Sequence, residues 1–277
     1  MASKITISVI VPSFNRGESL RLLLESLIRS DHIPDETIIN DDIRTDDVTA
    51  LVVDEFRQRG LNVRYINRNT SRSHARKIAS DLASGQLLLH LDSDMQVSPA
   101  LIRECVVKIR QGMDALVIPE ESYGDSFWAK CRWFERRMYV GNDVMESLRC
   151  VRHDVYDRAG GHDSQIDLWD DKDMDIRVRR LGVHVGHTKN AIYHSEGAPS
   201  LRDLVKKKMV YATDATRFKK QYSQQWRLQT NILYRYWIFL NHFKLGFEHP
   251  LLYAGVFVMK TAEFLGAGIA HIMPRKK

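Results

Sequence analysis

The stretch 85-GQLLLHLDSDMQVSPALI-102 joins a mainly apolar run to two acids one residue apart. Leu87–Leu91 is short and apolar, which is typical of a strand buried on both faces. Asp92 and Asp94 end the run, and a helical pattern follows. One interpretation is an ordinary turn, in which Ser98 caps a helix that starts at Pro99. The other is a pair of carboxylates that binds a hard divalent cation. Taken alone, the triplet favours the turn.

Strand and helix patterns alternate from the N-terminus up to this stretch. Strand patterns occupy residues 5–13, 36–41, 62–67 and 86–91, and helical patterns occupy residues 17–30, 46–60 and 71–85. Repeated strand–helix units of this length predict an α/β fold with a parallel sheet and right-handed crossovers. Ligands of such sheets bind at the carboxyl ends of the strands. This rule singles out 12-PSFN-15, 40-NDD-42 and 92-DSD-94.

Composition narrows the class of protein. With 277 residues, 44% of them hydrophobic, the chain can form one large domain, or one domain with an appendage. The net charge of +6 favours phosphate-bearing partners, but no nucleic-acid-binding signature is present and we expect no nucleic acid partner. Three scattered cysteines without a CxxC pair predict neither zinc binding nor a disulfide framework. The N-terminus runs directly into a strand pattern, so we expect a cytoplasmic protein.

Four motifs occur in order along the chain. They are Ser8–Leu27, Ile38–Asp47, Asn69–Asp94 and Ala159–Gly182. This ordered set resembles the inverting family 2 glycosyltransferases over roughly residues 5–197. The resemblance implies a GT-A fold, which is a Rossmann-like, mainly parallel sheet flanked by helices. It also implies a nucleotide-diphosphate sugar as donor and Mg²⁺ or Mn²⁺ as cofactor.

The resemblance implies contacts to the nucleotide at the ends of the first two strands. Pro12, Phe14 and Asn15 match the first strand end, where an aromatic ring stacks on the base; the alternative for Phe14 is core packing. Asp41 and Asp42 match the acids that recognise base and ribose, and solvated acids in a turn are the alternative. In this sequence Ile43-Arg44 replaces the usual Gly-Ser that follows, which weakens the inference of a uracil base.

Further donor contacts are implied around the D-x-D triplet. Arg76 matches a helix arginine near the nucleotide, and Arg72 lies one turn earlier on the same face. Either can pair with phosphate or with Asp92, or form a surface salt bridge. Asp94 matches a direct metal ligand, and Asp92 a ligand or a ribose contact. Ser93, between them, belongs with the nucleotide-binding residues.

A second set of acids, in 168-LWDDKDMDIRVRRLG-182, matches the family's catalytic helix start. Asp171 occupies the position of the general base, and Asp170 the usual glutamate position before it. A sugar hydroxyl is a weak nucleophile, and a carboxylate can take its proton as it attacks. The alternative is that Asp170 only caps the helix. In this interpretation, Asp173 and Arg177 form an ion pair within the helix and have a structural role. His194 matches a histidine that completes the metal shell, although lone histidines are often structural.

The C-terminal part has only helical patterns after Pro199. We therefore predict a catalytic domain at 1–197 and a helical extension at 198–277. Leu251–Met273 is long enough to span a bilayer, but Lys260, Glu263 and His271 fall on one helical face. This pattern favours a helix lying in the membrane interface with its apolar side down, so that residues 226–277 contact an anionic cytoplasmic membrane face. The alternative is a helical cap packed on the catalytic domain or on a second subunit of a homo-oligomer.

The sequence therefore predicts a metal-dependent inverting glycosyltransferase that acts on a hydroxyl of a glycan or a lipid-linked acceptor. Two other functions remain open. A sugar-phosphate nucleotidyltransferase also uses an α/β sheet and acids on Mg²⁺, but a Gly-rich basic loop after the first strand is expected there, and 12-PSFNRGES-19 is not such a loop. A non-catalytic glycan- or lipid-binding scaffold would not need both sets of acids.

Overall fold

The alternating strands and helices of the N-terminal half form as the sequence predicts, in a computed structural model that describes residues 4–42 and 48–272, with side chains up to residue 270. The chain divides into two compact units: residues 1–119 with 147–193, and residues 120–146 with 194–277. The predicted boundary at residue 198 lies close to the start of the last segment. The structure, however, groups residues 120–146 with the helical C-terminal part.

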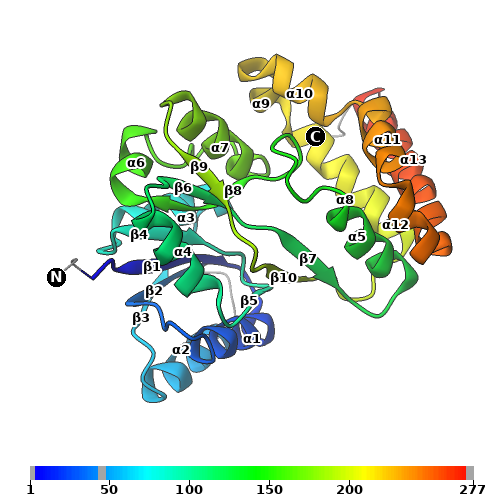
Figure 1. The fold of residues 1–277 in the computed structure, drawn as a ribbon. Coiled ribbons are helices and arrows are strands. Elements are labelled where there is room, and N and C mark those ends of the chain that lie inside the picture. Colours follow the sequence, from blue (N-terminus) through cyan, green and yellow to red (C-terminus); the bar gives the residue numbers. More distant parts are fainter. Residues whose placement is uncertain (1–3, 43–47, 273–277) are drawn as a thin grey trace. The chain divides into compact units, whose positions relative to one another are not determined.

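A mixed, mainly parallel sheet forms the centre of the first unit (Figure 1). Its strands are β1 (Ile7–Ser13), β2 (Glu36–Asp41), β3 (Val63–Asn67), β4 (Leu87–His90), β6 (Ala115–Val117), β8 (Leu148–Arg152) and β9 (Val185–His187). Among the described residues they lie in the order β3-β2-β1-β4-β8-β6-β9. The first four strands in this order are parallel to one another, and β8 is antiparallel to both β4 and β6. The predicted α/β class is confirmed.

The register brings the polar strand ends together. Ser13 at the end of β1 pairs with Asp41 at the end of β2, and Asp41 pairs with Asn67 of β3. The carboxyl ends of parallel strands thus meet at one edge of the sheet, as the sequence predicts.

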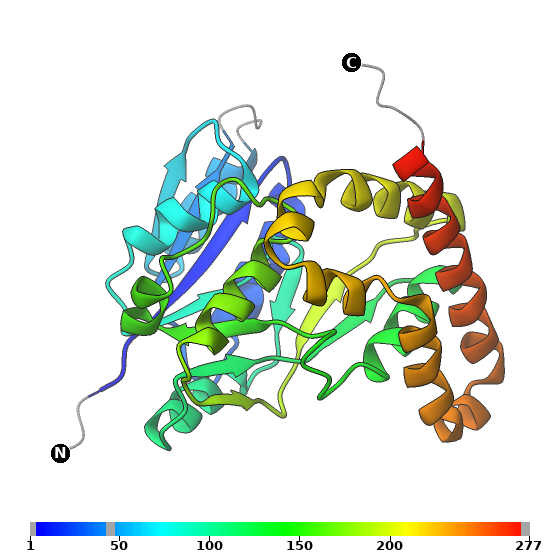
Figure 2. The same ribbon diagram turned by 90° about the horizontal axis from the view of Figure 1, so that it is seen from above.

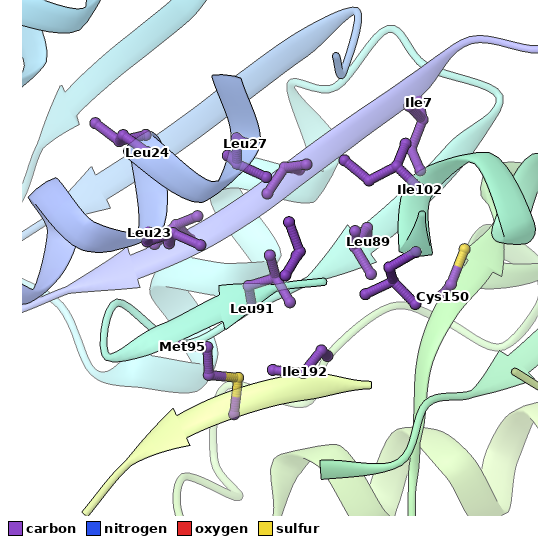
Figure 3. Close-up of a cluster of buried hydrophobic side chains, with 14 of the residues drawn as sticks. Ile7, Leu23, Leu24, Leu27, Leu89, Leu91, Met95, Ile102, Cys150 and Ile192 are labelled. Carbon is purple, nitrogen blue, oxygen red and sulfur yellow. The ribbon is translucent and has the colours of Figure 1, made fainter. Parts of the chain in front are cut away.

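Helices cover both faces of this sheet. They are α1 (Gly17–Ile28), α2 (Val48–Gln58), α3 (Arg72–Asp81), α4 (Leu101–Arg110), α6 (His153–Arg158) and α7 (Asp170–Arg180). Successive side chains of a strand point to opposite faces. Val9 and Val11 of β1 accordingly pack with α1, α2 and α4, whereas Ile10 packs with α3, α6 and α7. Figure 3 shows the first of these clusters, with Leu23 of α1 and Leu89 of β4 inside it.

The stretch after the D-x-D acids differs from the prediction. Met95–Val97 forms a short strand, β5, and α4 begins only at Leu101 with Ala100 as its N-cap. The Ser98 hydroxyl is buried without a hydrogen-bond partner in the part of the chain that the structure describes, so the predicted Ser98 cap is wrong. Met95 and Val97 are both buried. Their alternation around Gln96 was the sequence signal for this strand.

The second unit is mainly helical. It contains β7 (Glu120–Tyr123), α5 (Phe127–Arg137), α8 (Leu201–Asp214), α9 (Thr216–Gln221), α10 (Ser223–Gln229), α11 (Ile232–Asn241), α12 (Phe243–Glu248) and α13 (Pro250–Ile272). The strand β10 (Ile192–Ser195) carries the chain into it. A core of aromatic and aliphatic side chains joins α5, α11 and α13; Phe134, Phe239 and Phe257 belong to it. Figure 2 shows α13 as a long helix at the end of the chain.

The charged face of α13 is buried in this unit. Lys260 and Glu263 are each 1% exposed, and their side chains pair at 2.5 Å. The Lys260 Nζ also lies 2.7 Å from an oxygen of Glu135 on α5, and Arg132 approaches Glu263 at 3.7 Å. This face thus packs inside the protein, where partners on α5 compensate the buried charges. His271 lies outside the described side chains.

Length and composition single out the same helix. Among the described residues, Pro250–Ala270 is the one helical segment long and apolar enough to cross a membrane. One third of it (33%) is buried inside the protein.

We expect Lys260→Met to lower the free energy of unfolding by about 3–5 kcal/mol. The substitution leaves Glu135 and Glu263 buried without the ammonium group that lies between them. Urea denaturation followed by tryptophan fluorescence measures the change. Lys244→Met, on the exposed side of α12, is the matched control and should shift stability by less than about 0.5 kcal/mol. Equal shifts for the two variants would contradict this account of the buried charges.

Candidate active site

A buried arginine, Arg76 of α3, organises the polar edge of the first unit. Its guanidinium group pairs with Asp92 after β4 and with Asp170 and Asp171 at the start of α7, with 2.7 Å to Asp171. Burial opposes the charged form, but the three carboxylates outweigh it and raise the pKa of Arg76 well above its usual value. The alternative of a surface salt bridge is therefore wrong for Arg76, which is fully buried.

The N-terminal turn of α3 is tied to the loop before α7. Ser71 caps α3 by accepting a hydrogen bond from the backbone N–H of His74. Arg72, one turn before Arg76, donates to Asp170 at 3.0 Å and to the backbone carbonyl of Asp167 at 3.2 Å. These contacts join segments more than ninety residues apart in the sequence. They hold the acids of α7 against α3.

The two predicted catalytic acids have different surroundings. The Asp170 side chain is fully buried between Arg72 and Arg76, whereas the Asp171 side chain is 23% exposed. Burial raises the pKa of Asp170 to about 6, against the lowering effect of Arg76. Asp171 is thus the acid of the pair that a substrate can reach, and Asp170 acts from the interior on the arginines. Trp169 is the N-cap residue of α7, and Asp170 lies in the first turn of the helix, where it pairs with Arg72 and Arg76 as well as lying near the positive end of the helix dipole.

Asp171 and the strand-end acid Asp92 share two arginine partners. Both pair with Arg76, and the Nη1 of Arg149 lies 3.2 Å from Asp171 and 3.7 Å from Asp92. One small molecule can therefore contact both acids. Asp94, two residues after Asp92, pairs with the half-exposed Arg16. The predicted helix pair of Asp173 and Arg177 is confirmed, with 3.0 Å between Arg177 Nε and Asp173 Oδ2.

Residues predicted to contact the nucleotide lie at the adjacent strand ends. Phe14 is 54% exposed, so the alternative of core packing is wrong. It follows Pro12 of β1 and precedes Asn15, which has a left-handed backbone conformation (φ 50°) where the chain turns toward α1. These three residues thus lie at the carboxyl end of β1, as predicted.

Asp41 is a buried acid, and one of its two carboxylate oxygens accepts no hydrogen bond from the described residues. The Tyr65 hydroxyl donates to its Oδ2 at 3.0 Å, while its Oδ1 has no hydrogen-bond partner among the described residues. A buried carboxylate oxygen without a donor is costly unless a ligand supplies one. Asp42 and Ser93 are also buried. The alternative of solvated turn acids is therefore wrong, whereas Ile43 and Arg44 lie outside the described residues.

His194 lies on β10 in the second unit. Its Nδ1 is 2.9 Å from Arg136 Nη2 and 3.6 Å from Glu120 Oε2. Because arginine can only donate, Nδ1 is the acceptor in the first contact. Its role as a metal ligand stays a prediction.

Two groups of side chains can be weighed as cation ligands. His162, Asp170 and Asp171 offer donor atoms within 4.8 Å of one another. Their acids are already paired with arginines, however, so a cation there would lie among positive charges and does not fit. Asp92 and Asp94 are hard oxygen donors, each partly exposed. Although Asp92 also pairs with Arg76, they fit Mg²⁺ or Mn²⁺ through Asp94, because the half-exposed side chain of Arg16 can move away from it.

The sequence interpretation missed four side chains of this region. They are Arg16, Tyr65, Arg149 and His162. Arg16 follows directly on the first strand end, which was a usable signal. Arg149 lies on β8, and its approach to Asp92 follows from the pairing of β8 with β4, which the sequence pattern does not contain.

Residues 8–196, which make up more than half of the chain, match the model of the family Glycosyl transferase family 2. The chain belongs to Glycosyl transferase family 2. The predicted resemblance, over roughly residues 5–197, is thereby confirmed, and the helices α8–α13 lie beyond the matched range.

Among curated proteins, this family 2 chain is similar to the undecaprenyl-phosphate 4-deoxy-4-formamido-L-arabinose transferase of an Enterobacter species. The two are 26% identical over 139 residues, which cover 47% of this chain and 40% of the relative. The chain spans about two fifths of the length of the curated relatives it matches, between 38% and 41%.

Solved structures show the same fold. The mannosyltransferase PcManGT from Pyrobaculum calidifontis, in complex with GDP-Man and Mn²⁺, has a TM-score of 0.67 at 13% identity, covering 98% of this chain and 88% of that one. S. aureus TarS 1-349, in complex with UDP-GlcNAc, has a TM-score of 0.56 at 16% identity, covering 97% and 91%. The predicted GT-A-type fold with a helical C-terminal extension is confirmed.

Proposed function

We propose that this family 2 chain is a metal-dependent inverting glycosyltransferase that transfers a sugar from a nucleotide-diphosphate sugar to a hydroxyl group. The observation that carries the proposal is that Asp92, an acid of the D-x-D triplet, and Asp171, the partly exposed acid of α7, share Arg76 and Arg149. One donor–acceptor pair can bridge groups that lie this close.

Asp171 is the general base of the proposed reaction. Its carboxylate takes the proton of the acceptor hydroxyl as the hydroxyl oxygen bonds to the anomeric carbon. The bond from that carbon to the diphosphate breaks in the same step, and the diphosphate leaves with its electron pair. A single displacement of this kind inverts the configuration. Arg76 and Arg149 pair with the Asp171 carboxylate and hold it in place beside Asp92.

Asp94 and Asp92 are the residues that would hold Mg²⁺ or Mn²⁺. When bound, such a cation neutralises charge on the leaving diphosphate. Arg16 would then exchange its pairing with Asp94 for the phosphates, because guanidinium groups bind phosphate well. The Mn²⁺ in the PcManGT complex supports a metal of this class.

Asp41 and Phe14 are the proposed contacts to the nucleotide base and ribose. The open Oδ1 of Asp41 can accept an N–H of the base or a ribose hydroxyl, and the exposed ring of Phe14 can stack on the base. The two structural neighbours bind UDP-GlcNAc and GDP-Man, so one pyrimidine and one purine donor are the natural probes.

A hydroxyl group of a glycan or of a lipid-linked acceptor is the proposed acceptor class. The relative from Enterobacter acts, by its name, on undecaprenyl phosphate. An acceptor of this kind would place the enzyme at the cytoplasmic face of a membrane.

We expect Asp94→Asn to abolish the metal-dependent part of donor binding. Thermal unfolding of the wild type should shift upward with Mn²⁺ plus UDP-GlcNAc or GDP-Man, and less with either component alone. The variant loses an anionic ligand, so this extra shift should disappear. Asp54→Asn on α2, whose side chain is 61% exposed, is the control and should retain it. A full shift in Asp94→Asn would remove Asp94 from the metal site.

A further inference from the structure

The second unit has an exposed apolar stripe along α13. Leu251, Val258, Leu265 and Ile269 are between 48% and 78% exposed. Their spacing of seven, seven and four residues puts them on one side of the helix. The other exposed side chains along this stripe are small or uncharged, at Ala254 and Thr261. A stripe of this length without a charge is unusual for a surface that faces only water.

A second apolar stripe lies next to the first. On α11, Leu233, Trp237 and Leu240 are exposed, and on α12 Phe243 and Phe247 are exposed. We call the two stripes together the apolar face.

One contact fixes these helices beside each other. The hydroxyl of Tyr236 on α11 lies 2.5 Å from that of Thr261, which belongs to the α13 stripe. The rings of Tyr236 and Phe257 are 5.1 Å apart, and Figures 1 and 2 show α11 alongside α13. The α11 part of the second stripe therefore lies on a helix that contacts the α13 stripe.

We propose that the apolar face docks the second unit on an anionic membrane surface, with α13 lying flat in the interface rather than crossing the bilayer. The proposal rests on the proposed function, because docking on a membrane brings the enzyme to an acceptor only if that acceptor is lipid-linked. Aromatic and aliphatic side chains in an exposed face without charges suit the boundary between headgroups and acyl chains.

The buried charges of α13 decide between lying flat and crossing. Lys260 and Glu263 are held within the unit by each other and by Glu135. A crossing helix would have to break these pairs and place both charges in hydrocarbon, which is strongly unfavourable. With α13 flat, the paired face stays inside the protein and only the opposite, uncharged face meets lipid.

Charge favours an anionic lipid surface over a second copy of the chain. The second unit, residues 120–146 with 194–277, contains eighteen lysines and arginines against eleven acids, a net charge of +7, whereas the first unit carries a net charge of −1. Exposed cations of the second unit include Lys206, Lys207, Lys219, Lys220, Arg227 and Lys244. Two copies meeting through the apolar face would bring two strongly positive units together, but an anionic leaflet attracts them.

Sedimentation of the full chain with vesicles tests the proposal. We expect the full chain to bind phosphatidylcholine vesicles that contain phosphatidylglycerol. Its affinity for pure phosphatidylcholine vesicles, and for free glycerol phosphate, should be at least about tenfold lower. The triple variant Leu251→Ser/Val258→Ser/Leu265→Ser removes exposed apolar side chains and should lose at least about tenfold in vesicle affinity. The matched control is Val140→Ser/Val210→Ser/Leu228→Ser, which changes exposed apolar residues on other segments of the second unit and should bind as the wild type does.

A second readout reports insertion directly. Trp237 emission should shift to shorter wavelength on addition of the anionic vesicles, and Trp237→Phe should lose that shift. Unchanged binding of the triple variant, or equal binding to both kinds of vesicle, would overturn the proposal. A dimer in solution that the triple variant converts to monomer would overturn it in favour of a second copy.

The outcome is separable from that of the proposed function. The triple variant should keep the donor-dependent thermal shift, since it leaves the first unit unchanged. Asp94→Asn, conversely, should still bind the vesicles.

Discussion

Asp171→Asn is expected to lower the rate of sugar transfer by about 10²–10⁴-fold while donor binding is retained. The amide keeps the size of the side chain but cannot take the proton of the acceptor hydroxyl. The expectation depends on the partial exposure of Asp171 beside Asp92, in contrast to the complete burial of Asp170. Release of UDP from UDP-GlcNAc, or of GDP from GDP-Man, with an undecaprenyl-linked saccharide, which offers sugar hydroxyls, as probe acceptor measures the rate.

Controls separate this role from a general loss of structure. Asp157→Asn on α6, whose side chain is 67% exposed, should leave the rate unchanged. The donor-dependent thermal shift should persist in Asp171→Asn, because the D-x-D acids and Asp41 remain. A variant that still transfers at the wild-type rate would show that another group is the base. Pyrophosphate release from a nucleoside triphosphate and a sugar phosphate would favour the nucleotidyltransferase instead.

Arg76→Met is expected to produce the largest loss of stability in the first unit, about 3–5 kcal/mol. Arg76 is the shared partner of Asp92, Asp170 and Asp171, and its removal leaves Asp170 buried beside a single remaining arginine. A loss of this size corresponds to a fall in Tm of roughly 6–20 °C. Calorimetry measures it, and the emission of Trp169, the one tryptophan of the first unit, reports on the same region.

The neighbouring residue supplies the control for this variant. Lys77 is exposed on the same helix and pairs with Asp81 at 3.0 Å across one turn. Lys77→Met should change stability by less than about 1 kcal/mol, because exposed ion pairs contribute little. Arg76→Lys keeps the charge but not the planar fork, so it should fall between the two. If Arg76→Met were as stable as Lys77→Met, Arg76 would not be the organising group of this site.

Local patterns were sufficient for much of the fold. Apolar periodicity predicted the strands and helices of the N-terminal half, because each buries one face or one stripe against the sheet. The rule for the carboxyl ends of parallel strands then predicted that Phe14, Asp41 and Asp92 lie near one edge. The order of four motifs predicted the family. These features depend on residues close in sequence, or on a general property of parallel sheets.

The prediction failed where a local sequence pattern is compatible with two different structures. Ser98 can cap a helix or lie buried before it, and the burial of Met95 and Val97 in a strand decided the matter. The three-way pairing of Arg76 was also beyond the sequence pattern. One partner, Asp92, follows β4, and the other two lie at the start of α7, 94 and 95 residues from Arg76.

The C-terminal helix α13 shows most clearly which features the sequence determines and which the tertiary structure decides. Sequence alone determined that α13 has a charged side, with Lys260 and Glu263, and an apolar side. Only the tertiary structure decided which side faces inward, because Glu135 and Arg132 of α5 provide partners for the charges. Burying a charge is costly without a partner and tolerable with one, so the direction of an amphipathic helix depends on residues that its own sequence does not contain.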